Sequence, residues 1–236
     1  MCRRAVILAG GKGTRLRPYT VVLPKPLMPI GEYPILEVLI RQLAAHGFDH
    51  LTLAVNHQAE IIRAFCGDGQ RWGLRIDYSL EAKPLSTIAP LRLIPDLPEQ
   101  FLLLNGDVLT DLDFARFFDR HLLGDADFTI AAHRRVHRID YGVLHVDADS
   151  YLSGFEEKPS AAYLVSMGVY ALRRQVLELV PPDISYGFDH LMHDLLKERR
   201  PVRVQPHDGL WLDIGRPDDY ALAIDTFEQH RGKLLP

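Results

Sequence analysis

A glycine-rich loop with two cations close behind it is the first feature of this sequence that could do chemistry. Directly after the apolar run 5–9 comes the loop Gly10-Gly11-Lys12-Gly13-Thr14-Arg15, and shortly after it comes Pro24-Lys25-Pro26. Glycines allow a backbone to approach phosphate groups closely, and successive backbone N–H groups bind anions. Arg15 offers a planar guanidinium fork, whereas Lys25 offers a point charge on a segment that two prolines stiffen. The pattern predicts a polyphosphate site.

The loop matches neither of two common phosphate-binding motifs. A Walker loop needs Gly-Lys-Ser/Thr after its last glycine, and the dinucleotide fingerprint would need a glycine at Leu16. The glycines alone would favour a tight turn after a strand. Arg15 and Lys25 change that interpretation, because two fixed cations have no role in a simple turn.

Two aspartates follow apolar runs and could hold a metal ion. Asp107 ends the segment Leu104-Asn105-Gly106-Asp107, and Asp213 comes at the end of a second apolar run. Ligands of open α/β sheets gather at the carboxyl ends of the strands, and two carboxylates with open positions suit Mg²⁺. A single aspartate in a loop is often only a cap, so the residues alone leave that alternative open.

The elements that must position these residues change character after about residue 140. The first part alternates between strands (5–9, 51–55, 74–80, 101–104, 128–132) and helices (34–45, 60–65, 114–122). This order predicts a parallel sheet with helices on both faces. The second part has strands at 142–146, 151–155, 165–172, 202–205 and 210–214, and helices at 175–180, 188–199 and 217–230. We expect one domain over 1–236, with a nucleotide-binding part at about 1–140 and a substrate-binding part at about 141–236.

Composition limits the partners of the chain. The 27 basic and 31 acidic residues give a net charge of −4, so no overall positive field would recruit nucleic acid or an anionic membrane. No apolar run approaches the roughly 20 residues that span a bilayer. Cys2 and Cys66 are too few for a disulfide framework and are expected to be free thiols. These features predict a cytoplasmic protein.

The opening motif resembles the signature of the nucleotide-sugar pyrophosphorylases, in particular members like mannose-1-phosphate guanylyltransferase. The matching residues are Leu8-Ala9-Gly10-Gly11-x-Gly13-Thr14-Arg15-Leu16-x-Pro18-x-Thr20 and Pro24-Lys25-Pro26. The resemblance implies a doubly wound, Rossmann-like α/β fold with a mixed sheet. It also implies an enzyme that transfers a nucleoside monophosphate from a nucleoside triphosphate to a sugar 1-phosphate and releases pyrophosphate. A homo-oligomer is possible.

The resemblance also implies a role for each matching position. Arg15, Lys25 and Asp107 would serve catalysis, and Asp107 and Asp213 would hold Mg²⁺. The nucleotide would be bound by Leu8, Ala9, Gly10, Gly11, Gly13, Thr14, Arg15, Glu81, Pro84, Ser86 and Thr87. The sugar phosphate would be bound by Asn105, Tyr141, Gly142, Glu157, Lys158 and Ser166.

The donor base depends on a region where the chain departs from the family pattern. Ser86 stands where the family usually has Gly, and Ser166 where it commonly has Asn. Glu81 would lie near the base edge, where a carboxylate can accept both adjacent donors of guanine, whereas an amide would suit uracil or thymine. We therefore expect GTP. UTP or TTP remains the alternative if backbone groups near Leu8 and Gly11 recognise the base instead.

Two other classes of function compete with this interpretation. A non-catalytic regulatory relative that binds a nucleotide sugar should have lost cations or carboxylates, yet Arg15, Lys25, Asp107 and Asp213 are all present. A nicotinamide-dependent oxidoreductase is disfavoured because the dinucleotide spacing fails.

Overall fold

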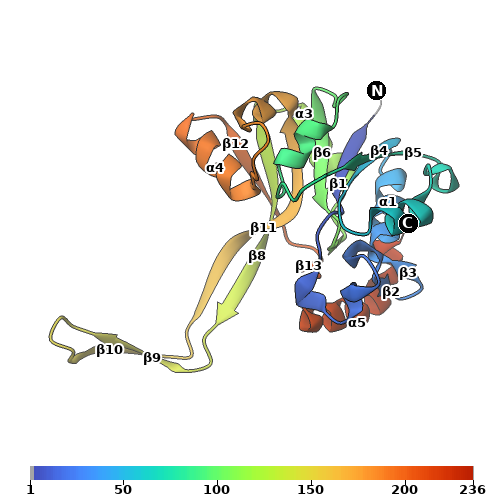
Figure 1. Cartoon of the computed structure of the whole chain (residues 1–236). Coiled ribbons are helices and arrows are strands. Elements are labelled where there is room, and N and C mark those ends of the chain that lie inside the picture. Colours follow the sequence, from blue (N-terminus) through green and yellow to red (C-terminus); the bar gives the residue numbers. More distant parts are fainter. Residues whose placement is uncertain (1–2, 236) are drawn as a thin grey trace.

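The computed structural model describes residues 3–235 and shows an α/β core from which a long two-stranded arm projects (Figure 1). We use "the arm" for residues 134–165. The core contains a mixed seven-stranded sheet, which confirms the predicted α/β fold with a mixed sheet.

The central sheet is parallel in the half that residues 4–105 form and mixed in the other half. Its strand order is β12-β8-β11-β6-β1-β4-β5. β1 pairs in parallel with β4 and β6, whereas β11 runs antiparallel to both β6 and β8. The strands are β1 (Arg4–Leu8), β4 (His50–Val55), β5 (Arg75–Leu80), β6 (Gln100–Asn105), β8 (Phe128–Arg138), β11 (Ser160–Arg173) and β12 (Val202–His207).

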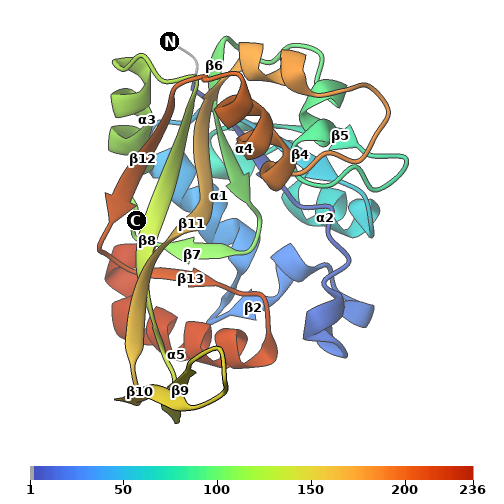
Figure 2. The same cartoon turned by 90° about the vertical axis from the view of Figure 1, so that its left-hand side faces the viewer.

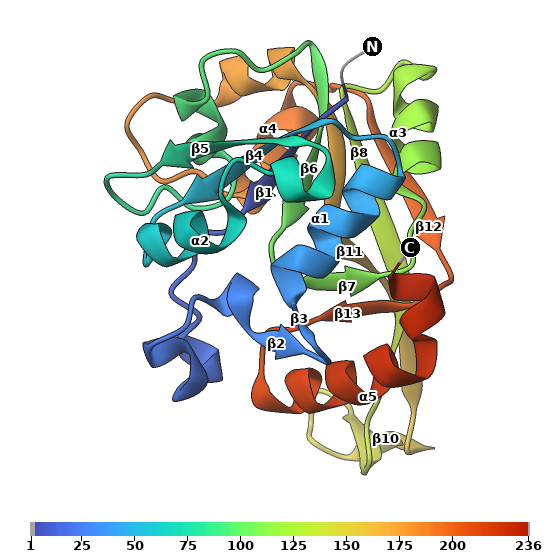
Figure 3. The same cartoon turned by 90° about the vertical axis from the view of Figure 1, so that its right-hand side faces the viewer.

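Helices cover both faces of this sheet, as Figures 2 and 3 show. On β6, Leu102 and Leu104 belong to the apolar cluster under α1 and α3, whereas Leu103 belongs to the cluster under α4. A strand with two covered faces is apolar at every position, which explains the uninterrupted apolar runs. The helices are α1 (Ile35–Ala45), α2 (Ala59–Cys66), α3 (Phe114–Leu122), α4 (Phe188–Lys197) and α5 (Pro217–Leu234).

A third apolar cluster lies below the sheet and joins the end of the chain to its beginning. It packs Phe227 of α5 against Leu16, Met28 and Leu109. Gly31, with φ of 56°, passes so close that a Cβ there would lie 2.7 Å from the Phe227 ring. The short strands of this region are β2 (Pro29–Ile30), β3 (Tyr33–Pro34), β7 (Val108–Thr110) and β13 (Trp211–Asp213).

Several connections are short 3-10 helices rather than coil. The helix predicted at 175–180 is one of them, because η6 (Arg174–Leu179) is a 3-10 helix. The others are η1 (Thr14–Leu16), η2 (Tyr19–Val21), η3 (Lys25–Leu27), η4 (Gln70–Trp72) and η5 (Ala89–Leu93). Cys66 is a buried free thiol, whose pKa burial raises to about 12, and Cys2 lies outside the described residues.

The arm is built from the continuation of β8 and β11 beyond the sheet. At its tip, β9 (Gly142–Val146) and β10 (Leu152–Glu157) form a separate antiparallel pair. No residue of 134–165 is buried. Figures 1 and 2 show the arm leaving the core at the lower end of the sheet. Within residues 3–235, no helix combines the length and the apolar character needed to cross a bilayer.

Candidate active site

A cavity of about 490 Å³ lies at the carboxyl ends of β1, β4 and β6, where the sequence predicted a ligand site. Ligand pockets commonly have such a volume. The cavity is lined by all the predicted nucleotide-binding residues and by Lys25, Asn105 and Asp107. These residues come from loops that follow different strands, so the parallel arrangement of β1, β4 and β6 brings them together.

The glycine-rich loop takes a tight course at the bottom of this cavity. Gly13 has φ of 60°, and a Cβ there would lie 2.9 Å from Thr20 Cγ2. The Thr20 hydroxyl donates a 2.7 Å hydrogen bond to the Gly13 carbonyl oxygen and fixes the turn. Gly106 makes a second close approach, because its N–H donates to the Leu8 carbonyl oxygen at 2.9 Å and a Cβ would meet that oxygen at 2.8 Å. Glycine is required where backbones come this close.

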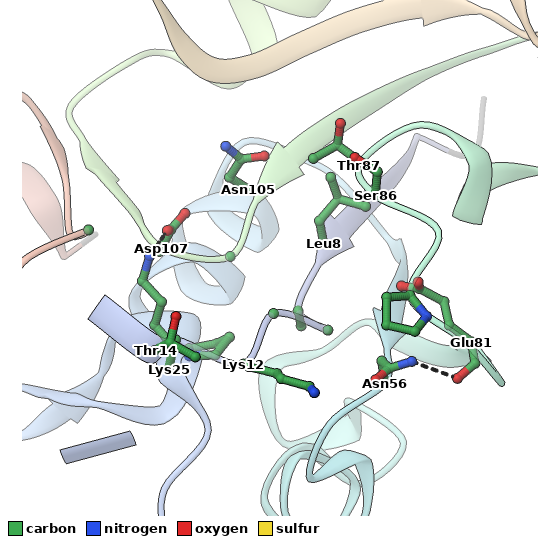
Figure 4. A pocket seen from close by; sticks show the side chains of 18 of the residues that line it. Leu8, Lys12, Thr14, Lys25, Asn56, Glu81, Ser86, Thr87, Asn105 and Asp107 are labelled. Carbon is green, nitrogen blue, oxygen red and sulfur yellow. Dashed lines mark hydrogen bonds and ion pairs between the residues drawn. The ribbon is translucent and has the colours of Figure 1, made fainter. Parts of the chain in front are cut away.

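Cations and carboxylates meet at one end of the cavity. Lys25 forms an ion pair with Asp107, and both side chains are mostly buried. Figure 4 shows these two side chains pointing toward each other. Asp213 lies opposite Val108 on the paired strand, and the next residue, Ile214, donates its N–H to the Asp107 carbonyl oxygen at 3.1 Å. The two aspartates therefore lie side by side, Asp213 at the end of β13 and Asp107 in the turn just before β7.

The environment of Asp213 shows how tightly these charges are packed. Burial and the nearby charge of Asp107 raise the pKa of Asp213, while Lys25 and Arg15 lower it. The Arg15 guanidinium and the Asp213 carboxylate each lie 3.4 Å from where a Cβ on Gly215 would stand. A buried pair of like charges favours a bound cation or a bound proton.

The carboxylates at this end of the cavity fit a magnesium ion that also binds substrate, and they do not fit a metal held by protein side chains alone. Within residues 3–235 no group of three or more His, Cys, Asp or Glu side chains could hold a metal. Mg²⁺ commonly takes one or two carboxylates and completes its shell with water and substrate phosphates. Asp107, which lines the cavity, and Asp213 beside it offer two carboxylates next to Lys25 and Arg15.

Glu81 and Asn56 form the opposite end of the cavity (Figure 4). Glu81 is 8 % exposed, and its Oε2 accepts the Leu85 N–H at 3.1 Å. Burial raises the pKa of Glu81, and the hydrogen bond from Leu85 opposes that shift. The Asn56 amide donates to the Glu81 carbonyl oxygen at 2.9 Å. Glu81 thus faces the cavity and also braces the turn from Pro84, so it does not point to solvent.

The turn from Pro84 to Thr87 is anchored to the start of α4. Thr87 Oγ1 accepts the Phe188 N–H at 2.8 Å, and Ser86 adopts φ of 70°. A positive φ disfavours residues with a side chain, which explains why glycine is common at this place in the family pattern.

Two of the predicted sugar-phosphate residues lie on the core. Asn105 ends β6 and lines the cavity. Ser166 lies on β11, where its hydroxyl donates to the Tyr170 hydroxyl at 3.0 Å. Gly168, two residues after Ser166, has φ of 72° and packs against Asn105, because a Cβ there would lie 2.6 Å from Asn105 Nδ2.

The other four predicted sugar-phosphate residues lie on the tip of the arm, away from this cavity. Gly142 and Glu157 are opposite each other on β9 and β10, and Tyr141 and Lys158 flank them. The structure brings these four residues to one place. None of them lines the cavity of the same chain.

Five lining residues were missed by the sequence reasoning: Lys12, Pro26, Asn56, Gly106 and Gly215. Asn56 directly follows β4, so the argument that placed Asp107 at the carboxyl end of its strand could have found it. Lys12 lies within the predicted loop itself, but the cations weighed there were Arg15 and Lys25. Gly106 and Gly215 neighbour the predicted aspartates.

Comparison with known proteins agrees with this geometry. The sequence profile described as Nucleotidyl transferase matches residues 4–230. The chain belongs to this family. The resemblance to nucleotide-sugar pyrophosphorylases is thereby confirmed.

Two curated relatives of this nucleotidyl transferase are named for different nucleotide donors. A UTP–glucose-1-phosphate uridylyltransferase from Synechocystis sp. is 34% identical over 241 residues, covering 94% of this chain and 62% of the relative. A mannose-1-phosphate guanyltransferase from Yarrowia lipolytica is 33% identical over 225 residues, covering 92% and 62%. The chain thus spans less than two thirds of the length of these relatives.

Solved structures match the fold over nearly the whole chain. HddC from Yersinia pseudotuberculosis has a TM-score of 0.75 at 27% identity, covering 95% of this chain and 99% of HddC. The same protein complexed with GMP-PN has a TM-score of 0.72 at 26% identity over the same shares.

Proposed function

We propose that this nucleotidyl transferase joins a nucleoside triphosphate to a sugar 1-phosphate and forms a nucleotide sugar and pyrophosphate. One observation carries the proposal. A single cavity combines the backbone of the glycine-rich loop, the cations Arg15 and Lys25, and Asp107, with Asp213 on the neighbouring strand. A non-catalytic nucleotide-sugar binder would have no need to keep both cations beside both carboxylates.

The reaction needs positioning and charge neutralisation more than acid or base groups. An anionic oxygen of the sugar phosphate attacks the α-phosphorus, and a new P–O bond forms while the bond to the bridging oxygen of pyrophosphate breaks. The electron pair of that bond leaves with pyrophosphate, so no side chain has to give or take a proton. Such reactions depend on in-line alignment and on electrostatic stabilisation of the transferred group.

The residues of this chain divide these tasks. The loop backbone around Gly11 and Gly13 holds the donor phosphates, and Arg15 and Lys25 stabilise the charge that develops on pyrophosphate. Lys25 is held in place by Asp107. Asp107 and Asp213 would hold Mg²⁺, which supplies positive charge to the phosphate oxygens when bound. Glu157 and Lys158 of the arm would receive the sugar phosphate.

GTP is the donor that we propose. Glu81 is buried at the end of the cavity opposite the ion pair, where a base would lie if the loop holds the phosphates. Its carboxylate can accept two adjacent donors, which guanine presents and uracil does not. The HddC complex with GMP-PN and the mannose-1-phosphate guanyltransferase relative support guanine, whereas the Synechocystis relative supports UTP.

Two further predictions from the sequence belong to this proposal. We propose that residues 1–140 bind the nucleotide and that 141–236 serve the sugar phosphate. The cytoplasmic location stays a prediction from the two cysteines and from the lack of an apolar run long enough to span a bilayer.

Pyrophosphate release from a grid of triphosphates and sugar 1-phosphates tests the proposal. GTP, UTP, TTP and ATP are each combined with a panel of sugar 1-phosphates that includes mannose 1-phosphate and glucose 1-phosphate, with and without Mg²⁺. We expect release only when both substrates and Mg²⁺ are present, with GTP as the best donor. Release without any sugar phosphate, or from no pair at all, would contradict the proposal.

A further inference from the structure

The arm exposes an unusual amount of apolar surface. Ten of the 23 large hydrophobic side chains that are exposed in the described part of the chain lie within residues 134–165. No residue of this segment is buried, and β9 and β10 pair only with each other. An isolated pair of strands is marginally stable in water, and contiguous apolar patches mark contact surfaces. The arm is therefore built to be covered.

One face of the arm tip carries both the apolar side chains and a predicted sugar ligand. Phe155 lies opposite Leu144, and Leu152 lies opposite Val146, with exposures of 58, 63, 65 and 62% respectively. Alternation places Glu157 on this same face, since it pairs with Gly142, two residues before Leu144. We call this face, with Gly142 and Glu157, the tip face. His145 and Glu156, hydrogen-bonded at 2.9 Å, lie on the other face.

The charges of the arm are divided between its base and its tip. Arg134 and Arg135 at the base, and Arg138 where β8 ends before the tip, are exposed and make no ion pair within residues 3–235. The tip carries the carboxylates of Asp140, Asp147, Asp149, Glu156 and Glu157 against one lysine, Lys158. Two arms that cross in opposite directions about a two-fold axis would set each acidic tip against the basic base of the other. The arm is therefore complementary to a second copy of itself.

The base of the arm lies next to the cavity. The arm begins where β11 passes Ser166 and Gly168, and Gly168 closely approaches Asn105, which lines the cavity. A partner tip that covers this base is thereby brought beside the cavity. Three cations, Lys12, Arg15 and Lys25, line the cavity, but Lys25 is paired with Asp107 and Arg15 lies near Asp213. The proposed function also assigns Arg15 and Lys25 to the donor, so a further lysine from an arm would serve the acceptor phosphate.

We infer that two copies of this chain exchange arms, so that Glu157 and Lys158 of each copy complete the sugar-phosphate side of the cavity in the other. The inference rests on the proposed function for the role of these two residues. The tip face packs against the partner, and the acceptor phosphate is held by a lysine from one chain while the donor is held by the glycine loop of the other. Exchange of an identical element is a known route to dimers.

Complementation between two inactive full-length variants tests the exchange. Asp107→Asn has a defective cavity and an intact arm, whereas Glu157→Ala/Lys158→Ala has an intact cavity and a defective arm. Each is assayed alone and after mixing, at a sugar 1-phosphate concentration below the wild-type KM. If arms work in trans, half of the randomly mixed dimers contain one complete site, so about a quarter of the wild-type activity returns.

Two results of this assay would overturn the inference. The first is a mixture no more active than its inactive components, while the wild type is active, since arms would then serve their own chain. The second is full activity of the arm variant alone. A wild type that forms no nucleotide sugar would instead refute the proposed function.

The molar mass in solution tests the exchange without any activity. We expect light scattering to give about twice the 26.8 kDa of the chain. Leu144→Asp/Phe155→Asp on the tip face should give the single-chain mass. Leu123→Asp, at an 89% exposed position on the core, is the matched control and should keep the double mass. A single-chain wild type, or a dimer that survives the tip-face variant, would overturn the inference.

Discussion

The cavity and the arm are both predicted to bind substrate, yet they are built in opposite ways. The cavity lies where β1, β4 and β6 end, and these strands are covered on both faces. The arm has no buried residue. Fixed donors lose little entropy when a ligand binds, so the cavity is suited to the triphosphate, whose transfer needs aligned charges. The arm has no such fixed donors. It is suited to a substrate that binds after a partner has covered the arm.

The packing of the core explains why the cavity can hold charges so close together. The Ala9 N–H donates to the Ala54 carbonyl oxygen at 2.8 Å, and Gly106 is bound to Leu8, so the loops continue the hydrogen bonding of the strands. Each fully buried Leu or Phe behind them contributes roughly 1.5–3 kcal/mol. This stability offsets the repulsion between Asp107 and Asp213 in the absence of ligand. The arm has no comparable source of stability.

The largest effect is expected at the charged end of the cavity. Asp107→Asn removes the negative partner of Lys25 and one of the two carboxylates proposed for Mg²⁺. We expect kcat to fall by a factor of about 10² or more, equivalent to about 2.7 kcal/mol of transition-state stabilisation, while the protein still folds.

Steady-state kinetics and circular dichroism of Asp107→Asn check this expectation. Asp125→Asn is the matched control, because that side chain is 88% exposed and pairs with Arg203 at the surface. The control should retain wild-type kcat. Comparable Mg²⁺-dependent turnover in Asp107→Asn and the wild type would remove the metal assignment.

A buried histidine of the core should make stability depend on pH in a way that the arm does not. His121 is fully buried, its Nδ1 is 2.8 Å from Thr129 Oγ1, and its pKa is lowered to about 4, mainly by burial. The unfolded chain then binds a proton that the folded chain rejects between about pH 6.5 and 4. The stability that the neutral side chain contributes is therefore present above pH 6.5 and is lost as the pH falls toward 4.

Urea unfolding at pH 7 and pH 5 measures this loss. His121 should account for about 2 kcal/mol of the decrease in unfolding free energy between these two pH values. In His121→Asn, which is less stable at pH 7, the decrease should be smaller by about that amount. An equal decrease in the variant and the wild type would show that His121 is not the group that titrates.

A smaller effect is expected at the base end of the cavity. Glu81→Gln should lower kcat/KM for GTP by about tenfold, or about 1.4 kcal/mol, relative to UTP and TTP, because the amide accepts one donor of guanine less well. Asn56 and Leu85 still hold the backbone in place. The measurement is kcat/KM for GTP, UTP and TTP, in the wild type and in Glu81→Gln. A wild type that favours UTP or TTP by tenfold would contradict the argument from Glu81.

The sequence predicted the cavity well because its residues follow directly from buried strands. Asp107 was expected at the carboxyl end of a buried strand and lies in the turn just after β6, since a continuous apolar run marks a strand covered on both faces and carboxyl ends share one edge. The helix predicted at 114–122 is present as α3, and Asp113 is its N-cap, because its side chain accepts the Arg116 N–H. Asn56 follows β4 in the same way, but it was missed because it lacks the charge that marked Asp107 as a candidate ligand.

The sequence did not predict the arm. The strands predicted at 142–146 and 151–155 are present as β9 and β10. Alternation describes which side chains share a face, but it does not say what that face packs against. The extension of β8 to Arg138 and of β11 from Ser160 depends on pairing between distant segments. The strands were therefore predicted, whereas their departure from the core was not.

Steady-state kinetics of Arg15→Ala and Lys158→Ala, with each substrate varied separately, test the division of the molecule most directly. Arg15 lies at the cavity near Asp213, and Lys158 lies on the arm. We predict that Arg15→Ala impairs catalysis with the triphosphate, whereas Lys158→Ala mainly raises the KM for sugar 1-phosphate and leaves the KM for GTP unchanged. The reverse pattern, in which Lys158→Ala weakens GTP and Arg15→Ala weakens the sugar phosphate, would contradict the account.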